Sequence, residues 1–144
     1  MLSDYRTWLE SELKLLGNAS HHAYSFGQAN MAKRAIERLD QEVGERLILA
    51  LERAEPSLAE RLDPRLPYTG AVVVYAARAE HARTVDDVLA RRTRALFTDV
   101  AAARASAPLV AQLLARERGR DDEWRRDQCA AFGAIAREDA AAFA

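Results

Sequence analysis

The segment Thr84–Phe97 constrains the fold most, because its apolar residues share one face only if the chain is helical. Val85, Val88, Leu89 and Leu96 fall on one stripe at helical spacing. Thr84 is a candidate N-cap, and two aspartates follow it in the first turn, where the helix dipole favours negative charge. We therefore predict an amphipathic helix with one buried face, extending to about residue 105.

Most of the chain repeats this pattern, with glycine or proline between the segments. The expected helices span residues 3–16, 20–39, 42–54, about 69–82, about 84–105, about 108–118 and 121–137, with a short helical turn at 57–62. The stretch Val72–Tyr75 has high β-propensity, but a lone strand would leave its backbone groups unpaired, so we assign it to a helix. The first two helices form a hairpin, because short connections favour antiparallel neighbours. The predicted fold is all-α, a compact bundle of about seven helices with an N-terminal helical hairpin.

The composition predicts a soluble, cytoplasmic chain. The formal net charge is −1, which gives no general attraction for nucleic acid or anionic lipid. The single cysteine, Cys129, cannot form an intramolecular disulfide, so a reducing compartment is the simplest expectation. We expect no signal peptide and no transmembrane segment.

The distribution of residue types suggests a boundary near Asp40. Both lysines and both asparagines lie within the first 33 residues, and residues 41–144 contain neither type. We predict an N-terminal hairpin over residues 1–40, with separate origin as one interpretation, and a helical domain over residues 41–144. A chance fluctuation in a short segment is the alternative.

Motifs for catalysis and for cofactor or metal binding are absent from the sequence. No glycines form a dinucleotide-binding or P-loop pattern, so the chain has no place for a flavin held in the Rossmann manner. The adjacent His21 and His22 would point about 100° apart on a helix, which disfavours joint metal binding. Cys129 lacks a visible base partner and is interpreted as an inert thiol. We therefore expect no catalytic, cofactor-binding or metal-binding residue here.

Two groups of residues remain as candidate contacts. Arg91, Arg92 and Arg94 are candidates for an inter-domain or anion contact, and a solvated helical face with an Asp87–Arg91 pair is the alternative. The aromatic residues Tyr5, Trp8, Tyr24 and Phe26 are candidates for a protein interface, with ordinary core packing as the alternative.

The sequence also resembles a known family. The resemblance rests on Leu66-Pro67-Tyr68, the run Val73–Arg78, the arginine-rich helix, and Ala115-Arg116-Glu117 followed by Trp124 and Ala130-Ala131-Phe132. With these motifs, residues 42–143 look like the C-terminal helical domain of bacterial FAD-dependent, aerobic-type glycerol-3-phosphate dehydrogenases. Residues 1–36 show no resemblance that we recognise. After Arg78 the family typically continues with a His-Glu-Met-like run, of which only Glu80 matches here.

The resemblance implies a role outside catalysis. In that family the helical domain caps the FAD-binding and substrate-binding parts, and the whole enzyme oxidises glycerol 3-phosphate and associates peripherally with the inner membrane in some members. Whether this chain acts as part of an enzyme stays open, because it lacks flavin-binding and catalytic motifs. In the parent family the FAD is held by a different domain. The leading hypothesis is a non-catalytic cap that packs against the FAD/substrate domain. The alternative is a stand-alone helical interaction module, such as a homo-oligomer formed through the hairpin.

Overall fold

The computed structural model describes residues 26–142 of the chain, without the side chains of residues 26–33, 35, 36 and 142. The chain divides into two compact units, residues 1–42 and 43–144. Helix α2 (Phe26–Ala54) begins in the first unit and ends in the second. The predicted helix 3–16, and with it the hairpin, lies outside the described residues. The proposed separate origin of residues 1–40 stays a prediction.

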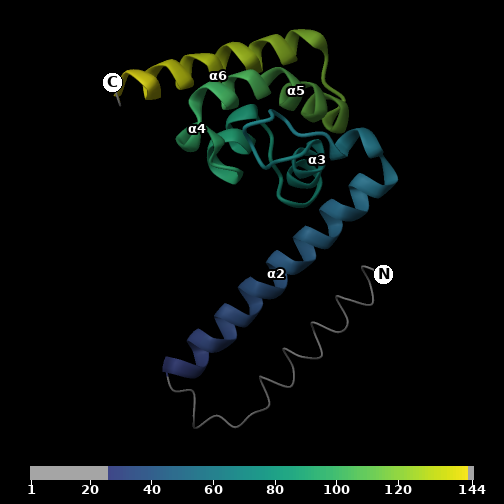
Figure 1. The fold of residues 1–144 in the computed structure, drawn as a ribbon, viewed down its shortest axis with the longest axis vertical. Coiled ribbons are helices and arrows are strands. Elements are labelled where there is room, and N and C mark those ends of the chain that lie inside the picture. The colour runs from purple at the N-terminus through teal and green to yellow at the C-terminus, as the bar shows by residue number, and fades with distance from the viewer. Residues whose placement is uncertain (1–25, 143–144) are drawn as a thin grey trace. The chain divides into compact units, whose positions relative to one another are not determined.

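The second unit is built from helices. After α2 come the 3₁₀-helix η1 (Pro56–Ala59), α3 (Gly70–Ala79), the π-helix η2 (Asp87–Arg92), α4 (Ala95–Thr98), α5 (Val100–Arg118) and α6 (Asp122–Ala142) (Figure 1). The described residues contain no strand beyond one isolated antiparallel bridge between Arg61 and Thr69. The predicted all-α fold is confirmed, and Val72–Tyr75 is helical as expected.

Two local helix signals act as the sequence predicted. Gly119 follows α5 in the left-handed conformation with a φ of 61°, which glycine adopts without a steric penalty. Asp121 caps α6, because its carboxylate accepts a hydrogen bond of 2.9 Å from the Trp124 N–H.

The break predicted between residues 39 and 42 was wrong. No proline interrupts the chain between Leu39 and Glu42, and α2 continues through Gly44. This glycine is buried, and a Cβ atom placed there would lie 3.2 Å from the Tyr75 hydroxyl oxygen. Gly44 therefore makes room for a neighbouring ring and does not end the helix.

The single helix predicted over residues 84–105 is also wrong, because the chain breaks twice within it. η2 ends at Arg92, Arg94 takes a left-handed φ of 56°, and Asp99 separates α4 from α5. A further helix was expected to begin near Pro108, but this proline lies inside α5. Pro108 lacks an N–H, so the carbonyl of Arg104 loses its usual helical donor. The buried face of α5 extends on both sides of Pro108 and keeps the helix continuous there.

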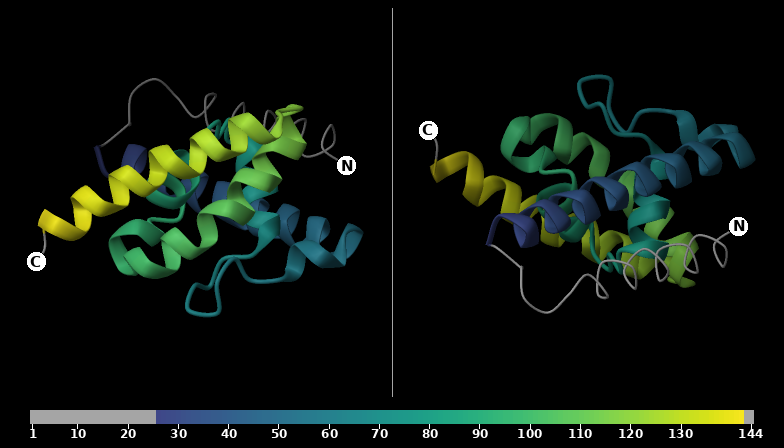
Figure 2. Two further views of the ribbon diagram at one scale, coloured as in Figure 1. Left: turned by 90° about the horizontal axis from the view of Figure 1, so that it is seen from above. Right: turned by 90° about the horizontal axis from the view of Figure 1, so that it is seen from below.

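The core of the second unit centres on α5, which packs against α3, α4 and α6. Helix α6 turns back after Gly119 and packs on α5, as the left view of Figure 2 shows. Many of the buried residues are alanines, whose small side chains let helices approach closely. The largest fully buried side chains are Phe132, Leu89, Leu96 and Leu114.

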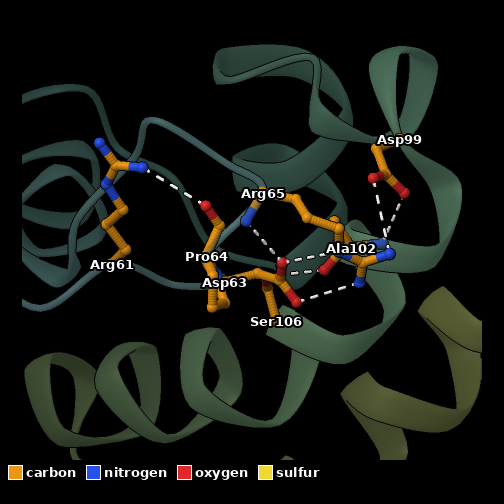
Figure 3. A network of polar contacts seen from close by, with 7 residues as sticks. All are labelled: Arg61, Asp63, Pro64, Arg65, Asp99, Ala102 and Ser106. Atoms are coloured by element: carbon orange, nitrogen blue, oxygen red, sulfur yellow. Dashed lines mark hydrogen bonds and ion pairs between the residues drawn. The ribbon is translucent and has the colours of Figure 1, made fainter.

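A polar network joins the connector before α3 to the start of α5 (Figure 3). Asp63 is 8% exposed and accepts hydrogen bonds from the Arg65 backbone N–H (2.9 Å) and from the Arg65 guanidinium (3.0 and 3.1 Å). These bonds hold the pKa of Asp63 below its ordinary value, the side-chain bond from Arg65 contributing most. The same guanidinium lies 3.6 Å from Asp99, which caps α5 by accepting from the Ala102 N–H at 2.8 Å.

A second network links α3, α5 and the residue before η1. Glu117 accepts two hydrogen bonds from the Arg78 guanidinium, at 2.6 and 3.1 Å. Arg116 bridges Glu117 (3.2 Å) and Glu55 (2.6 Å). The hydrogen bond from Arg78 is the main cause that holds the pKa of Glu117 below its ordinary value, against the opposing effect of burial.

Replacing Asp99 should separate its two roles. Asp99→Ala removes both the helix cap and the ion pair and should lower the free energy of unfolding by about 1–2 kcal/mol. Asp99→Asn keeps a capping oxygen and should lose under about 1 kcal/mol, because a partly exposed ion pair contributes little. Urea unfolding would measure both, with Asp127→Ala on the exposed face of α6 as the control. Equal losses for the two variants would contradict the capping role.

The Glu117 network should make stability depend on acid pH. Because the folded-state pKa of Glu117 lies below its unfolded value, its stabilisation is present above the unfolded pKa of about 4.3 and is lost as the pH falls through the folded value. The difference in unfolding free energy between the wild type and Glu117→Gln should therefore shrink below about pH 4. The exposed Glu123→Gln variant should show no such pH-dependent difference. A constant difference for Glu117→Gln across this range would exclude the mechanism.

Candidate functional site

The segment Glu80–Arg94, here called the arginine segment, has the most unusual backbone of the described chain. It contains the π-helix η2, in which the Thr93 N–H donates to the Val88 carbonyl five residues earlier, at 2.9 Å. His81 and Arg94 are the two non-glycine residues with positive φ in the part of the chain that the structure describes, at 59° and 56°. Strained backbone of this kind persists only where surrounding contacts hold it, and it often marks a functional segment.

The helical turn that leads into η2 is fixed by reciprocal capping, as the sequence indicated for Thr84. The Asp87 N–H donates to the Thr84 hydroxyl, and the Thr84 N–H donates to the Asp87 carboxylate, both at 3.1 Å. The Arg83 N–H adds a bond of 2.9 Å to the same carboxylate. Burial raises the pKa of Asp87, but these hydrogen bonds together outweigh it and leave the pKa below its ordinary value. The carboxylate therefore stays charged and holds the turn.

The three candidate arginines diverge. The Nε atom of Arg91 lies 3.4 Å from Asp86 and 3.7 Å from Asp87. Arg92 lies 3.6 Å from the Glu80 carboxylate and donates to the Glu80 carbonyl at 2.8 Å. Arg94 instead places its guanidinium 5.9 Å from the centre of the Phe97 ring. The predicted Asp87–Arg91 pair is present, and the run does not converge on one point.

Arg91 and Arg92 line a small hollow of about 250 Å³ together with Glu80, His81, Ala82 and Asp87. Each arginine in it faces at least one carboxylate, so the charges of the hollow nearly balance. A balanced hollow attracts anions weakly, which favours a structural role for this pair.

Three other elements hold the arginine segment in place. The Tyr68 hydroxyl donates to the Thr93 carbonyl at 2.6 Å, and Gln128 of α6 accepts from the Val85 N–H at 3.2 Å. Arg118 of α5 donates twice to the Ala82 carbonyl, at 2.9 and 2.6 Å. Sequence reasoning missed the roles of Arg118 and Gln128, because each bonds a backbone atom far away in the chain.

The other candidates from the sequence are placed as follows. Tyr5, Trp8, Tyr24, His21 and His22 lie outside the described residues, and Phe26 begins α2 without a described side chain. The aromatic interface therefore stays a prediction. His81 is exposed, and Cys129 is half-buried. Burial raises the pKa of the Cys129 thiol, which disfavours the reactive thiolate.

Residues 26–142 present no group of three or more histidine, cysteine, aspartate or glutamate side chains that could hold a metal ion. Among these residues no helix has both the length and the apolar character needed to cross a membrane.

Removing the Tyr68 hydroxyl should loosen the arginine segment. Tyr68→Phe keeps the ring but leaves the Thr93 carbonyl without this donor, at a cost of about 1 kcal/mol. Amide hydrogen exchange should accelerate in residues 85–94 more than in α6, which serves as the internal control. Equal acceleration in both places would show that the bond contributes only to global stability.

Comparison with known proteins places the chain in a family. Residues 10–125 match the model of the family described as the C-terminal domain of alpha-glycerophosphate oxidase. This range begins well before residue 42, so it includes most of the N-terminal segment that showed no resemblance on its own. No solved structure matches the chain.

Individual relatives agree with this assignment. The chain is 37% identical over 73 residues to a mitochondrial glycerol-3-phosphate dehydrogenase of Macaca fascicularis and to that of Homo sapiens. It is 40% identical over 73 residues to a probable mitochondrial glycerol-3-phosphate dehydrogenase of Caenorhabditis elegans. Each match spans 51% of this chain but 10% of the relative. These relatives are animal enzymes, so a bacterial origin stays a prediction. The chain belongs to the family of C-terminal domains of alpha-glycerophosphate oxidase.

Proposed function

We propose that this chain is the non-catalytic helical cap of an FAD-dependent glycerol-3-phosphate dehydrogenase or oxidase. The observation that carries the proposal is the family match over residues 10–125. The cap would pack against the FAD/substrate domain and support its assembly, while the flavin and the oxidation of glycerol 3-phosphate would belong to that other domain. We place the enzyme in the cytoplasm, with peripheral attachment to the inner membrane as the family resemblance suggests.

The way the family motifs contact one another supports a structural role. Tyr68 of the Leu-Pro-Tyr motif bonds the arginine segment, and Arg78 at the end of the Val73–Arg78 run bonds Glu117 of the Ala-Arg-Glu motif. The polar side chains of these motifs therefore form hydrogen bonds within the domain, to one another's segments. Arg91 and Arg92 likewise face carboxylates within the same segment.

Arg94 and Phe97 are the residues that we propose for contact with the FAD/substrate domain. Phe97 is 57% exposed, which is unusual for a large aromatic side chain, and Arg94 stacks near its ring. Arg94 takes part in no ion pair among residues 26–142. A cation and an aromatic ring exposed side by side are the kind of anchor that protein interfaces use.

Two measurements test the cap proposal. The purified chain should bind no FAD in a fluorescence titration and should not oxidise glycerol 3-phosphate. It should bind the FAD/substrate domain of a family member prepared without its own C-terminal helices, as measured by calorimetry. Phe97→Ala should weaken that binding about tenfold, as loss of an interface anchor does, whereas Arg126→Ala on α6 should not. Tight binding of FAD by the chain alone would overturn the proposal.

Light scattering distinguishes the rival homo-oligomer. The cap proposal expects the oligomeric state of the chain to be the same with and without residues 1–40. Loss of a dimer on removal of these residues would favour the stand-alone interaction module.

A further inference from the structure

A cavity between α5 and α6 carries an inference that concerns neither the arginine segment nor the proposed domain contact. It has a volume of about 350 Å³, at the small end of the range for ligand sites. Arg104 and Ala107 reach it from α5, and Cys129, Phe132, Gly133 and Arg137 reach it from α6. Its wall thus combines two cationic groups with apolar surface and a thiol.

The two arginines of this cavity differ from Arg91 and Arg92 in their partners. Neither Arg104 nor Arg137 belongs to any ion pair formed within residues 26–142, whereas Arg91 and Arg92 each face a carboxylate there. No aspartate or glutamate lines the cavity. Two positive charges therefore face one small space without a neutralising group in its wall, and this arrangement attracts an anion.

Gly133 allows Arg137 to reach the cavity. A Cβ atom placed at Gly133 would lie 3.8 Å from the Nη1 atom of Arg137, so the guanidinium folds back along α6 over the glycine one turn earlier. This direction is the one that helical side chains prefer, towards the N-terminal end of their helix. Arg104 approaches from α5, so the two guanidinium groups come from two different helices.

The geometry favours a phosphate monoester over a carboxylate. A carboxylate has two oxygens, and a single guanidinium fork satisfies both. A phosphate monoester has three terminal oxygens and nearly two negative charges, so it can accept from both arginines at once. The apolar surface of Ala107 and Phe132 suits a short carbon chain attached to the phosphate. We propose that Arg104 and Arg137 form a binding site for a small phosphate monoester in the cavity between α5 and α6.

Cys129 provides a built-in reporter for the test, because it lines the cavity and is the only cysteine of the chain. Inorganic phosphate and propyl phosphate should slow its alkylation by neutral iodoacetamide, read by intact mass, with ionic strength held constant by chloride. Protection should be saturable, half-complete on the order of 1 mM as for a partly exposed site. Protection that does not saturate, or no protection at all, would overturn the proposal.

Reagent charge gives a second, independent readout. The ratio of the Cys129 alkylation rates for anionic iodoacetate and neutral iodoacetamide reports the potential in the cavity. A change in the thiol pKa affects both rates alike and cancels in the ratio. Arg104→Gln and Arg137→Gln should each lower the ratio about threefold, because each removes one positive charge near the thiol. Arg126→Gln is the matched control, since Arg126 lies on α6 but does not line the cavity. Equal ratios in all four proteins would contradict the site.

Vesicle binding distinguishes a phosphate group on a lipid from one on a soluble ester. Sedimentation with vesicles that contain phosphatidate, but not with vesicles of phosphatidylcholine alone, would assign the site to a lipid headgroup if Arg104→Gln abolishes it. Protection by propyl phosphate without vesicle binding would assign it to a soluble ester. The protection measured on the unaltered chain tests the site even if a variant fails to fold.

Discussion

The fold of the second unit depends on hydrogen-bond partners for the backbone N–H and carbonyl groups of the arginine segment, which is not a regular helix. Between Ala82 and Thr93 the chain turns, enters a π-helix and leaves it, so several carbonyls and N–H groups lack their ordinary helical partners. Side chains from Tyr68, Arg118 and Gln128 supply them instead. A buried backbone group without a partner costs free energy comparable to a lost hydrogen bond, so the connector and the two last helices must meet at this segment.

Two classes of arginine differ in their partners. Arg78, Arg91 and Arg92 each face a carboxylate, and Arg78 connects α3 to α5 in this way. Arg104 and Arg137 have no such acidic partner in the cavity that they line. The sequence alone does not show which arginine belongs to which class, because an arginine can pair with a carboxylate that is distant in the chain, as Arg78 does with Glu117.

Sequence reasoning worked where the cause is local. Thr84, Gly119 and Asp121 act within four residues of their own positions, and each was identified from residue type and place alone. It failed where the outcome depends on packing. A break was expected between Leu39 and Glu42, but α2 continues through it and through Gly44, where the Tyr75 ring packs. Pro108 looked like a helix start, yet the buried face of α5 carries the helix through it.

The candidate site shows the same division. The Asp87–Arg91 pair was expected from helical spacing. The structure contains it, with 3.7 Å between Arg91 Nε and the Asp87 carboxylate, but both residues lie in a π-helix and not in an α-helix. The break after Arg92 was not foreseen, because Thr93 resembles any polar helix residue until its hydroxyl is seen to donate to the Val88 carbonyl at 2.9 Å. That bond competes with the continuation of the helix in a way that spacing alone does not reveal.

The π-helix also determines which kind of sequence change this fold can absorb. A π-turn holds one residue more than an α-turn, so the segment Asp87–Arg92 behaves like an α-helix that has accepted an insertion. Deleting one residue there would restore a regular α-turn and leave the chain that follows near its present position, because the π-turn holds the extra residue locally. The same deletion in the regular helix α5 would rotate everything that follows by about 100° about the helix axis. Substitutions within η2 test individual contacts, whereas a one-residue deletion tests whether the extra residue itself is needed.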